Sequence, residues 1–292
     1  TRKTQNLRCD LAGSVREIQR HGIEVAGGFI VGFDGEAEDI FERQLRFIEQ
    51  AGIPMAMVGL LIALPNTQLY RRLQREGRLI EDEDSPQIHG NNTHTLSLNF
   101  RPQMDREVLL DGYKRLLAEL YSPRRYFQRC LALLDSLPPR PSIKRPLTLQ
   151  DVRAFLRSLF RQGFSPYGLQ YLGFLASSLL SHPRLFPAAV KMAVRGHHFF
   201  TLTRELLRAD AFSSLLTETL AEIQRGMTEA LHRGSREQLI AQERRLTSLL
   251  ASIWRSYVQL GRGVQHIVQD SFLAFMSSCQ ALLSRLRLAC LA

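Results

Sequence analysis

Residues 23–34 read Ile-Glu-Val-Ala-Gly-Gly-Phe-Ile-Val-Gly-Phe-Asp, and this stretch decides the fold of the first part of the chain. It is short, apolar and rich in β-branched residues, which is typical of a buried strand in a parallel sheet. Glycines inside a strand usually mark the close approach of a ligand or of another backbone. Gly28 and Gly32 share one face with Ile30 between them. We interpret this face as a flat stripe that suits a planar ligand such as a purine and ends at Asp34; tight packing of a helix on the strand is the alternative.

The sequence around this strand predicts alternating helices and strands up to about residue 80. We expect helices near residues 10–19, 36–50 and 68–75, and a second buried strand at 55–64. Alternation with short connections indicates βα units and a parallel sheet. Because two strands are too few for such a sheet to stand alone, we expect the end of a larger α/β sheet or barrel whose earlier strands lie outside this chain.

The remainder of the chain divides at a proline-rich segment. Residues 81–135 predict a small α+β extension, with a short strand at 93–100 and helices at 106–121 and 123–134. Residues 136–147 are basic and proline-rich, and we interpret them as a semi-rigid linker. The region 148–292 predicts helices throughout, at 151–161, 167–181, 186–200, 203–232, 237–260 and 264–288. The predicted fold class is therefore α/β followed by all-α.

The composition narrows the possible functions. The 292 residues are 45% hydrophobic and 23% charged, which is ordinary for a globular protein with a sizeable core. A formal net charge of +10 favours phosphate groups, nucleic acid or an anionic membrane as partners. Arginines in the last third alternate with acids at helical spacing, which indicates a solvated face, so we expect no nucleic-acid partner.

The cysteines argue against a metal site made by this chain alone. Cys9, Cys130, Cys279 and Cys290 form no CxxC pair and no cluster with histidines. We therefore expect no metal ligands here, inert thiols at Cys9 and Cys130, and a reduced, cytoplasmic setting. The chain begins without Met and without an apolar stretch, so we expect a piece of a longer protein rather than a signal peptide.

Several blocks of sequence, in order, resemble a known family. They resemble the late part of the radical SAM barrel in the subgroup with an N-terminal cobalamin-binding domain, followed by that subgroup's C-terminal domain of unknown function. The resemblance covers roughly residues 5–200, and nothing beyond about Arg204 is similar to the family. The blocks are Gln5–Leu7, Ser14–Gln19, Gly22–Val25, Gly27–Asp34, Asp39–Phe41, Ala51–Gly59, Ala63–Thr67, Gly90–Thr93, Asn99–Pro102, Met104–Arg106, Tyr121–Tyr126 and His182–Pro187.

The resemblance implies an enzyme that reduces S-adenosylmethionine (SAM) with a [4Fe-4S] cluster to make a 5′-deoxyadenosyl radical. Cobalamin-binding members often methylate unactivated carbons. The Cys-x-x-x-Cys-x-x-Cys motif that holds the cluster, the cobalamin domain and the first barrel strands are all absent from this chain. The resemblance therefore implies that residues 1–80 end a (β/α) barrel. The missing N-terminal barrel and cobalamin domain of the same protein would be its partners, and the fragment alone would be inactive.

The resemblance also implies which residues contact the SAM adenine. By strict spacing the family's acid falls on Gly35, with Asp34 and Glu36 on either side, and we take Asp34 as the candidate. Asn66 stands where relatives often have glycine, which requires a positive φ. The residues implied to pack against the adenine or to offer it backbone groups are Gly28, Ile30, Gly32, Ala63, Leu64 and Pro65.

A substrate site and a phosphate site have weaker candidates. His89, Asn91, Asn92 and His94 would line the substrate mouth if their loop folds over the barrel; a solvated turn is the alternative. The pair Arg124-Arg125, beside Tyr121 and Tyr126, would suit a phosphate or a lipid headgroup, although an exposed helix start is favoured.

Membrane contact also has candidate segments. Phe164–His182 is nearly long enough to span a bilayer, but its serines, Pro166 and Gln170 favour a buried or interfacial helix. A set of basic and histidine side chains beside Phe199-Phe200 suits a membrane-surface helix or, equally, a packed core with a basic exterior. That set is Lys191, Arg195, His197 and His198.

These observations lead to one main hypothesis and one alternative. The main hypothesis is the C-terminal part of a cobalamin-dependent radical SAM enzyme that methylates or rearranges the carbon skeleton of a small-molecule or lipid-like substrate. This chain would supply the adenine-side wall and part of the substrate mouth, in the cytoplasm or at a membrane. The alternative is a basic helical interaction or membrane-surface module that carries an inert α/β remnant. A freely expressed fragment would expose the edge of its first strand, which favours pairing or aggregation.

Overall fold

The computed structural model describes residues 10–80, 96–139, 148–233 and 236–291. The chain divides into two compact units, Thr1–Thr203 and Arg204–Ala292, which are described separately. The division lies at 203/204, whereas the sequence places a linker at 136–147, of which residues 140–147 lie outside the described ranges. The boundaries expected at 80/81, 135/136 and 147/148 stay predictions.

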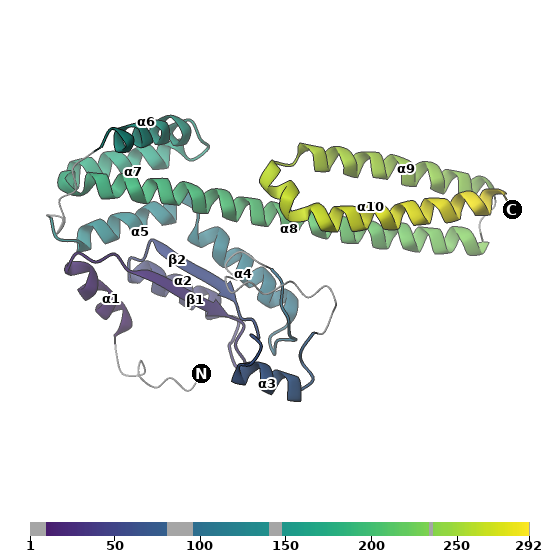
Figure 1. Cartoon of the computed structure of the whole chain (residues 1–292), viewed down its shortest axis with the longest axis horizontal. Coiled ribbons are helices and arrows are strands. Elements are labelled where there is room, and N and C mark those ends of the chain that lie inside the picture. The colour runs from purple at the N-terminus through teal and green to yellow at the C-terminus, as the bar shows by residue number, and fades with distance from the viewer. Residues whose placement is uncertain (1–9, 81–95, 140–147, 234–235, 292) are drawn as a thin grey trace. The chain divides into compact units, whose positions relative to one another are not determined.

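The first unit begins with the predicted alternation of helix and strand (Figure 1). The helix expected at 36–50 starts only at Ile40, because residues 34–39 form turns in which Glu36 bonds back to the strand before it. The strand expected at 93–100 is absent from its described part, where Phe100 makes a single antiparallel bridge with Leu79. The elements are α1 (Leu11–Arg20), β1 (Ala26–Val31), α2 (Ile40–Gln50), β2 (Met55–Leu60), α3 (Gln68–Arg75), α4 (Arg106–Leu120), α5 (Pro123–Ser136), α6 (Leu149–Gly163), α7 (Gly168–Ser181), η1 (Pro183–Leu185) and the first part of α8 (Phe186–Arg233).

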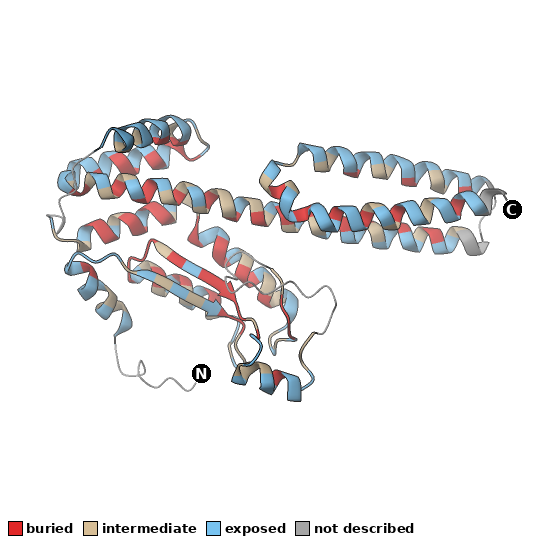
Figure 2. Cartoon of the chain, viewed as in Figure 1, coloured by how far each residue is buried: buried red, intermediate tan, exposed pale blue. Residues whose placement is uncertain are grey.

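The two strands form a parallel sheet with one covered face. β1 and β2 pair in register from Ala26↔Met55 to Val31↔Leu60. Val31, Val58 and Leu60 are buried on one face, where Phe29 also meets Phe47 of α2 edge to face with ring centroids 6.0 Å apart. Figure 2 shows this burial, with β2 mostly buried and β1 mixed. The βαβ unit expected from the sequence is therefore present, although a barrel is not seen in the described residues.

The outer edge of β2 is closed by tyrosines of the α4 region. Tyr113 of α4 donates its hydroxyl hydrogen to the Val58 carbonyl at 3.0 Å, and Tyr121, the C-cap residue of α4, donates to the Ala56 carbonyl. Both hydroxyls occupy positions that a further strand would need for its own hydrogen bonds. At the outer edge of β1 the described residues place no strand, and Gln44 donates its side-chain amide to the Ile30 carbonyl at 2.9 Å. The described side chains therefore engage two carbonyls at the β2 edge and one at the β1 edge, so a further strand would fit better beside β1.

A buried arginine ties α5 to the sheet. Arg129 is 2% exposed and donates to the carbonyls of Ile53, just before β2, and Leu120, at the end of α4. Desolvation lowers the pKa of this guanidinium below its usual value. The neighbouring Cys130 is fully buried, and burial raises the pKa of its thiol to about 12, which confirms an unreactive cysteine. Cys9 lies outside the described residues.

The packing of α4 against α2 requires a glycine, which gives a testable prediction. A Cβ atom on Gly112 would overlap the buried ring of Phe41. We expect Gly112→Ala to lower the free energy of unfolding by about 1–3 kcal/mol, because overpacking forces the ring or the helix to move. Urea unfolding followed by circular dichroism measures the change. Gly163→Ala is the control, since its Cβ meets nothing within 4 Å, and an equal loss there would contradict the packing argument.

The helical hairpin α6–α7 packs with the first unit rather than with the end of the chain. Phe174 of α7 stacks on Phe127 of α5 with ring centroids 4.8 Å apart. The Thr148 hydroxyl and the Asp151 carboxylate form a capping box that starts α6. No helix in the described part of the chain is long and apolar enough to cross a membrane.

The second unit is made of three helices: the rest of α8, α9 (Arg236–Gln259) and α10 (Arg262–Leu291). The break expected between residues 200 and 203 is wrong, because α8 is continuous there and the Thr201 hydroxyl donates to the His197 carbonyl within the helix. Tyr257 stacks on Phe272 at 3.9 Å between ring centroids. Other buried side chains of this core are Phe212, Leu216, Ile223, Met227, Leu246, Ile253, Val264, Val268, Phe275, Cys279 and Leu286.

Candidate functional site

The open face of the sheet carries a glycine in two successive cross-strand pairs. Gly28 lies beside Met57, and Ile30 lies beside Gly59. Ile30 is 47% exposed and Met57 is 41% exposed, while a Cβ on Gly28 would meet nothing within 4 Å. We call these four residues the glycine ledge. Gly28, Ile30 and Met57 are exposed, as the sequence predicts for Gly28 and Ile30, whereas Gly59 is buried. Gly32, which the sequence also placed on this face, is buried against Leu109, so that part of the expectation is wrong.

The carboxyl end of β1 turns sharply beside this ledge. Gly32 has φ +103°, a conformation that other residues rarely adopt, and a Cβ there would lie 3.3 Å from the Leu109 side chain. The Glu36 carboxylate accepts hydrogen bonds from the backbone N–H groups of Gly32 at 2.8 Å and of Phe33 at 3.1 Å. Burial raises the pKa of Glu36, and the two hydrogen bonds oppose that rise. Of the two acids that flank Gly35, Glu36 is the one folded against the tip of the strand.

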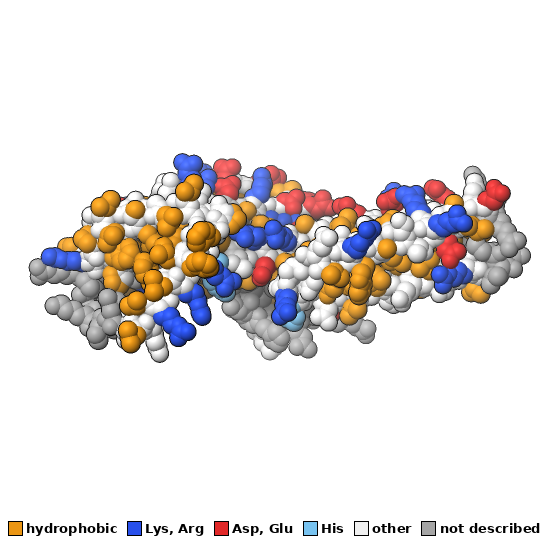
Figure 3. All heavy atoms as spheres, turned by 90° about the horizontal axis from the view of Figure 1, so that it is seen from above, with side chains coloured by type: hydrophobic (Ala, Val, Ile, Leu, Met, Phe, Trp, Pro, Cys, Tyr) orange, Lys and Arg blue, Asp and Glu red, His pale blue; other side chains and the backbone are white. Residues whose placement is uncertain are grey.

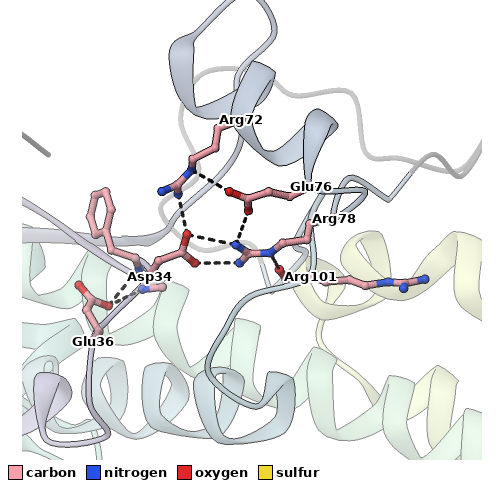
Figure 4. A network of polar contacts seen from close by, with 8 residues as sticks. Asp34, Glu36, Arg72, Glu76, Arg78 and Arg101 are labelled. Carbon is pink, nitrogen blue, oxygen red and sulfur yellow. Dashed lines mark hydrogen bonds and ion pairs between the residues drawn. The ribbon is translucent and has the colours of Figure 1, made fainter.

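Asp34, the acid favoured from the sequence, lies in an ion-pair network (Figure 4). Arg78 contacts both of its oxygens at 2.8 and 3.1 Å, and Arg72 reaches one of them at 2.6 Å. Arg78 also donates to the Arg101 carbonyl at 2.8 Å and to Glu76 at 2.9 Å. The hydrogen bond from Arg78 holds the pKa of Asp34 below its usual range. The network joins the tip of β1 to α3 and to the segment around Arg101, so Asp34 acts in this structure as an anchor.

This network predicts an acid-dependent loss of stability. The folded-state pKa of Asp34 lies below its ordinary value of 3.8, so its stabilising effect is complete above about pH 4 and is lost as the pH falls below that. We expect Asp34→Asn to lower the free energy of unfolding at pH 7 by about 1–2 kcal/mol and to reduce the stability difference between pH 7 and pH 3. Urea midpoints at both pH values measure this. Glu17→Gln, which removes only exposed contacts with Arg20 and His21, is the control; an equal effect there would contradict the assignment.

The segment after β2 is held by an asparagine from a distant part of the chain. Asn99 is 8% exposed and forms two hydrogen bonds with one residue: its carbonyl oxygen accepts from the Ala63 N–H at 3.0 Å, and its amide donates to the Ala63 carbonyl at 2.9 Å. This pair of hydrogen bonds takes the place of a neighbouring strand and positions residues 61–65. Sequence reasoning gave Asn99 no role in the site, although it begins a block that resembles the family, Asn99–Pro102, and is polar between Leu98 and Phe100.

The three residues expected to offer backbone groups to a ligand differ in accessibility. Ala63 is fully buried, and its N–H and carbonyl are both engaged by Asn99. Leu64 is 43% exposed and Pro65 is also exposed, so these two remain on the surface at the exit of β2. Asn66 has φ +66°, which confirms the positive φ expected there.

The remaining candidates do not add to this site. His89, Asn91, Asn92 and His94 lie outside the described residues. Arg125 forms ion pairs with Glu49 at 2.7 Å and with Glu119 at 3.1 Å, so its charge is already matched, and the phosphate site stays a prediction. Within the described ranges there is no group of three or more His, Cys, Asp or Glu side chains that could hold a metal ion.

Comparisons with known proteins find one family model and two relatives named as methylating enzymes. Residues 67–211 match a family model described as a domain of unknown function, DUF4070. An uncharacterized methyltransferase of Synechocystis sp. (strain ATCC 27184 / PCC 6803 / Kazusa), sll1242, is 34% identical over 214 residues, which cover 72% of this chain and 39% of that protein. The hopanoid C-2 methylase of Rhodopseudomonas palustris (strain TIE-1) is 30% identical over 237 residues, which cover 75% of this chain and 41% of the methylase.

The similarity covers only part of this chain and only part of each relative. The chain spans about two fifths of the length of these curated relatives. No solved structure matches it. Over roughly three quarters of its length the chain is therefore similar to proteins named as methylating enzymes, and its residues 67–211 match the domain of unknown function described above.

Proposed function

We propose that this chain is the part of a radical SAM methylase that receives the adenine of SAM, and that it forms the end of the barrel. The observation that carries the proposal is the glycine ledge, where a side chain is missing at Gly28 and the adjoining Ile30 and Met57 are exposed. The names of two relatives, a methyltransferase and a methylase, support the reaction class.

The residues of the ledge suit a flat heteroaromatic ring. A planar base can lie against the bare backbone at Gly28, with the Ile30 and Met57 side chains beside it. Such contacts are apolar and sulfur–aromatic, and they tolerate a neutral ring but do not hold a charge. Glu36 keeps the Gly32–Phe33 turn in place, and Asn99 fixes the segment that leads to Leu64, so the two ends of the site are positioned independently.

The other cofactors belong to a different part of the proposed enzyme. When bound, a [4Fe-4S] cluster and cobalamin would supply the electron and the methyl carrier. The described residues offer no set of ligands that fits such a cluster, so we derive no step through it. We propose that their ligands come from sequence that precedes this chain in the same protein. The preceding strand would pair with β1, because tyrosines close the edge of β2.

The substrate class we propose is an apolar carbon skeleton, since one relative is named as a hopanoid methylase. The experiment uses the protein from the complete reading frame, purified without oxygen and incubated with SAM carrying a deuterated methyl group. Lipid extract from a strain that lacks the gene is the acceptor. We expect deuterated methyl groups in an apolar product, detected by mass spectrometry. Failure of the complete protein to bind SAM would overturn the proposal, whereas SAM binding with label only in a polar product would overturn the substrate class.

A further inference from the structure

We propose that the outer face of the α6–α7 hairpin docks on the surface of an anionic lipid bilayer. The first observation is an apolar stripe along α6, on one face at helical spacing. Leu149 is 89% exposed, Val152 48%, Leu156 57% and Phe160 73%. A helix of a soluble protein normally turns such a stripe toward its core. Here the stripe faces outward.

The neighbouring helix extends the same apolar surface. α7 contains no charged residue between Gly168 and Ser181. Leu169 is 86% exposed and Leu180 is 83% exposed, and Phe164 in the turn between the helices is 84% exposed. Figure 3 shows hydrophobic side chains gathered in a patch over α6 and α7, with basic side chains at its margin. Contiguous apolar patches of this kind mark interaction sites rather than ordinary surface.

The inner side of the hairpin is fixed, so these side chains cannot simply turn inward. Tyr171 is fully buried and its hydroxyl lies 3.1 Å from that of Ser158, which joins α7 to α6. Phe174 packs on α5. The two helices therefore hold the outer apolar face away from the core of their own unit.

The charges around the patch select its partner. Arg153, Arg157 and Arg161 follow one another at four-residue spacing, each one position after a residue of the apolar stripe, and all three are exposed. Within the described residues they form no ion pair, and the only acid in residues 148–203 is Asp151, which caps α6. Arg184 and Lys191 add further exposed charges. Apolar side chains beside unpaired cations fit the boundary between acyl chains and anionic headgroups.

The same charges disfavour pairing with a second copy of this chain. A two-fold contact through this face would bring one row of unpaired arginines close to another, which is repulsive. An anionic bilayer neutralises that row and covers the leucines and phenylalanines at the same time.

The structure divides the basic set that the sequence expects on a membrane: Lys191 and His198 are exposed, whereas Arg195 and His197 are half-buried and bonded within the first unit. Phe200 is buried and Phe199 stacks on Tyr121 with ring centroids 4.8 Å apart. Arg195 pairs with Glu24 at 2.7 Å, and the His197 ring bonds to the Tyr167 hydroxyl. The surface we propose therefore takes Lys191 from that set and does not depend on its other members.

Vesicle co-sedimentation tests the proposal and does not depend on methyl transfer. The complete protein is mixed with vesicles of phosphatidylglycerol and phosphatidylcholine, and with vesicles of phosphatidylcholine alone. We expect binding to the anionic vesicles that weakens with salt. The double variant Leu156→Ser/Phe160→Ser and the triple variant Arg153→Gln/Arg157→Gln/Arg161→Gln should each bind roughly tenfold less tightly. Circular dichroism checks that both remain folded, which their exposure predicts.

The control variant is Val258→Ser/Leu273→Ser, which removes two apolar side chains of the second unit that are each 56% exposed. It should bind like the wild type. Equal binding by all variants, or equal binding to neutral vesicles, would overturn the proposal. Absence of vesicle binding, together with a dimer that Leu156→Ser/Phe160→Ser dissolves, would assign the patch to a second copy instead.

Discussion

Replacing Gly28 with leucine is expected to weaken SAM binding by the complete protein strongly while leaving its fold intact. The leucine side chain would occupy the glycine ledge, where the backbone is now bare and no atom lies within 4 Å of a Cβ position. Loss of the stacked contact removes on the order of 2–3 kcal/mol, so we expect SAM affinity to fall roughly 100-fold. Methyl transfer should fall with it.

Two features make this variant informative. Gly28 is exposed and does not adopt a positive φ, so a side chain fits the strand, and leucine should leave stability unchanged or slightly higher. The measurement is the dissociation constant for SAM, by equilibrium dialysis, beside the urea midpoint.

Ala26→Leu is the matched control for this variant. Ala26 is exposed on the same face of β1, two residues before Gly28 and further from the carboxyl end of the strand. The Ala26→Leu variant should therefore retain SAM binding. If Gly28→Leu binds SAM as tightly as the wild type, the ledge is not the adenine site. If Ala26→Leu loses affinity equally, the effect does not arise from the ledge.

The second large effect is expected at Asn99. Leucine has nearly the same size, but it would leave the Ala63 N–H and carbonyl buried without partners. Each unsatisfied group costs about 1–3 kcal/mol, so we expect Asn99→Leu to lower the free energy of unfolding by roughly 2–4 kcal/mol. SAM affinity should also fall, because the segment that carries Leu64 and Pro65 loses its anchor.

Asn99→Asp separates the two hydrogen bonds. The carboxylate keeps the acceptor for the Ala63 N–H but removes the donor to its carbonyl and buries a charge, so this variant should be less stable at pH 7 than at pH 4. Asn66→Gly serves as the control in the same segment, since its φ of +66° suits glycine. Urea unfolding at both pH values measures the changes. Full stability of Asn99→Leu would contradict the role of this asparagine.

Local patterns in the sequence predicted most helices and both strands. The limits of α1, α3, α4 and α5 follow from caps and apolar spacing that lie within the same few residues, such as Asp10 before α1 and Asp105 before α4. Asn66 stands where relatives often have glycine, and its φ of +66° meets the condition under which asparagine can replace it. Gly28 and Ile30 could be placed on one face because the period of a strand is fixed at two residues.

The sequence by itself determined the strands and helix of the βαβ unit, the shared face of Gly28 and Ile30, and the helical character of residues 148–233 and 236–291, because each depends on near neighbours. Only the tertiary structure decided that Asp34 bonds to Arg78, that Asn99 holds Ala63, and that the outer face of α6–α7 is uncovered. Those partners lie 36 to 44 residues apart along the chain or belong to different helices, and no local pattern specifies which distant group will meet them. Burial and long-range hydrogen bonds arise from packing of the whole unit, so they appear only once the chain has folded.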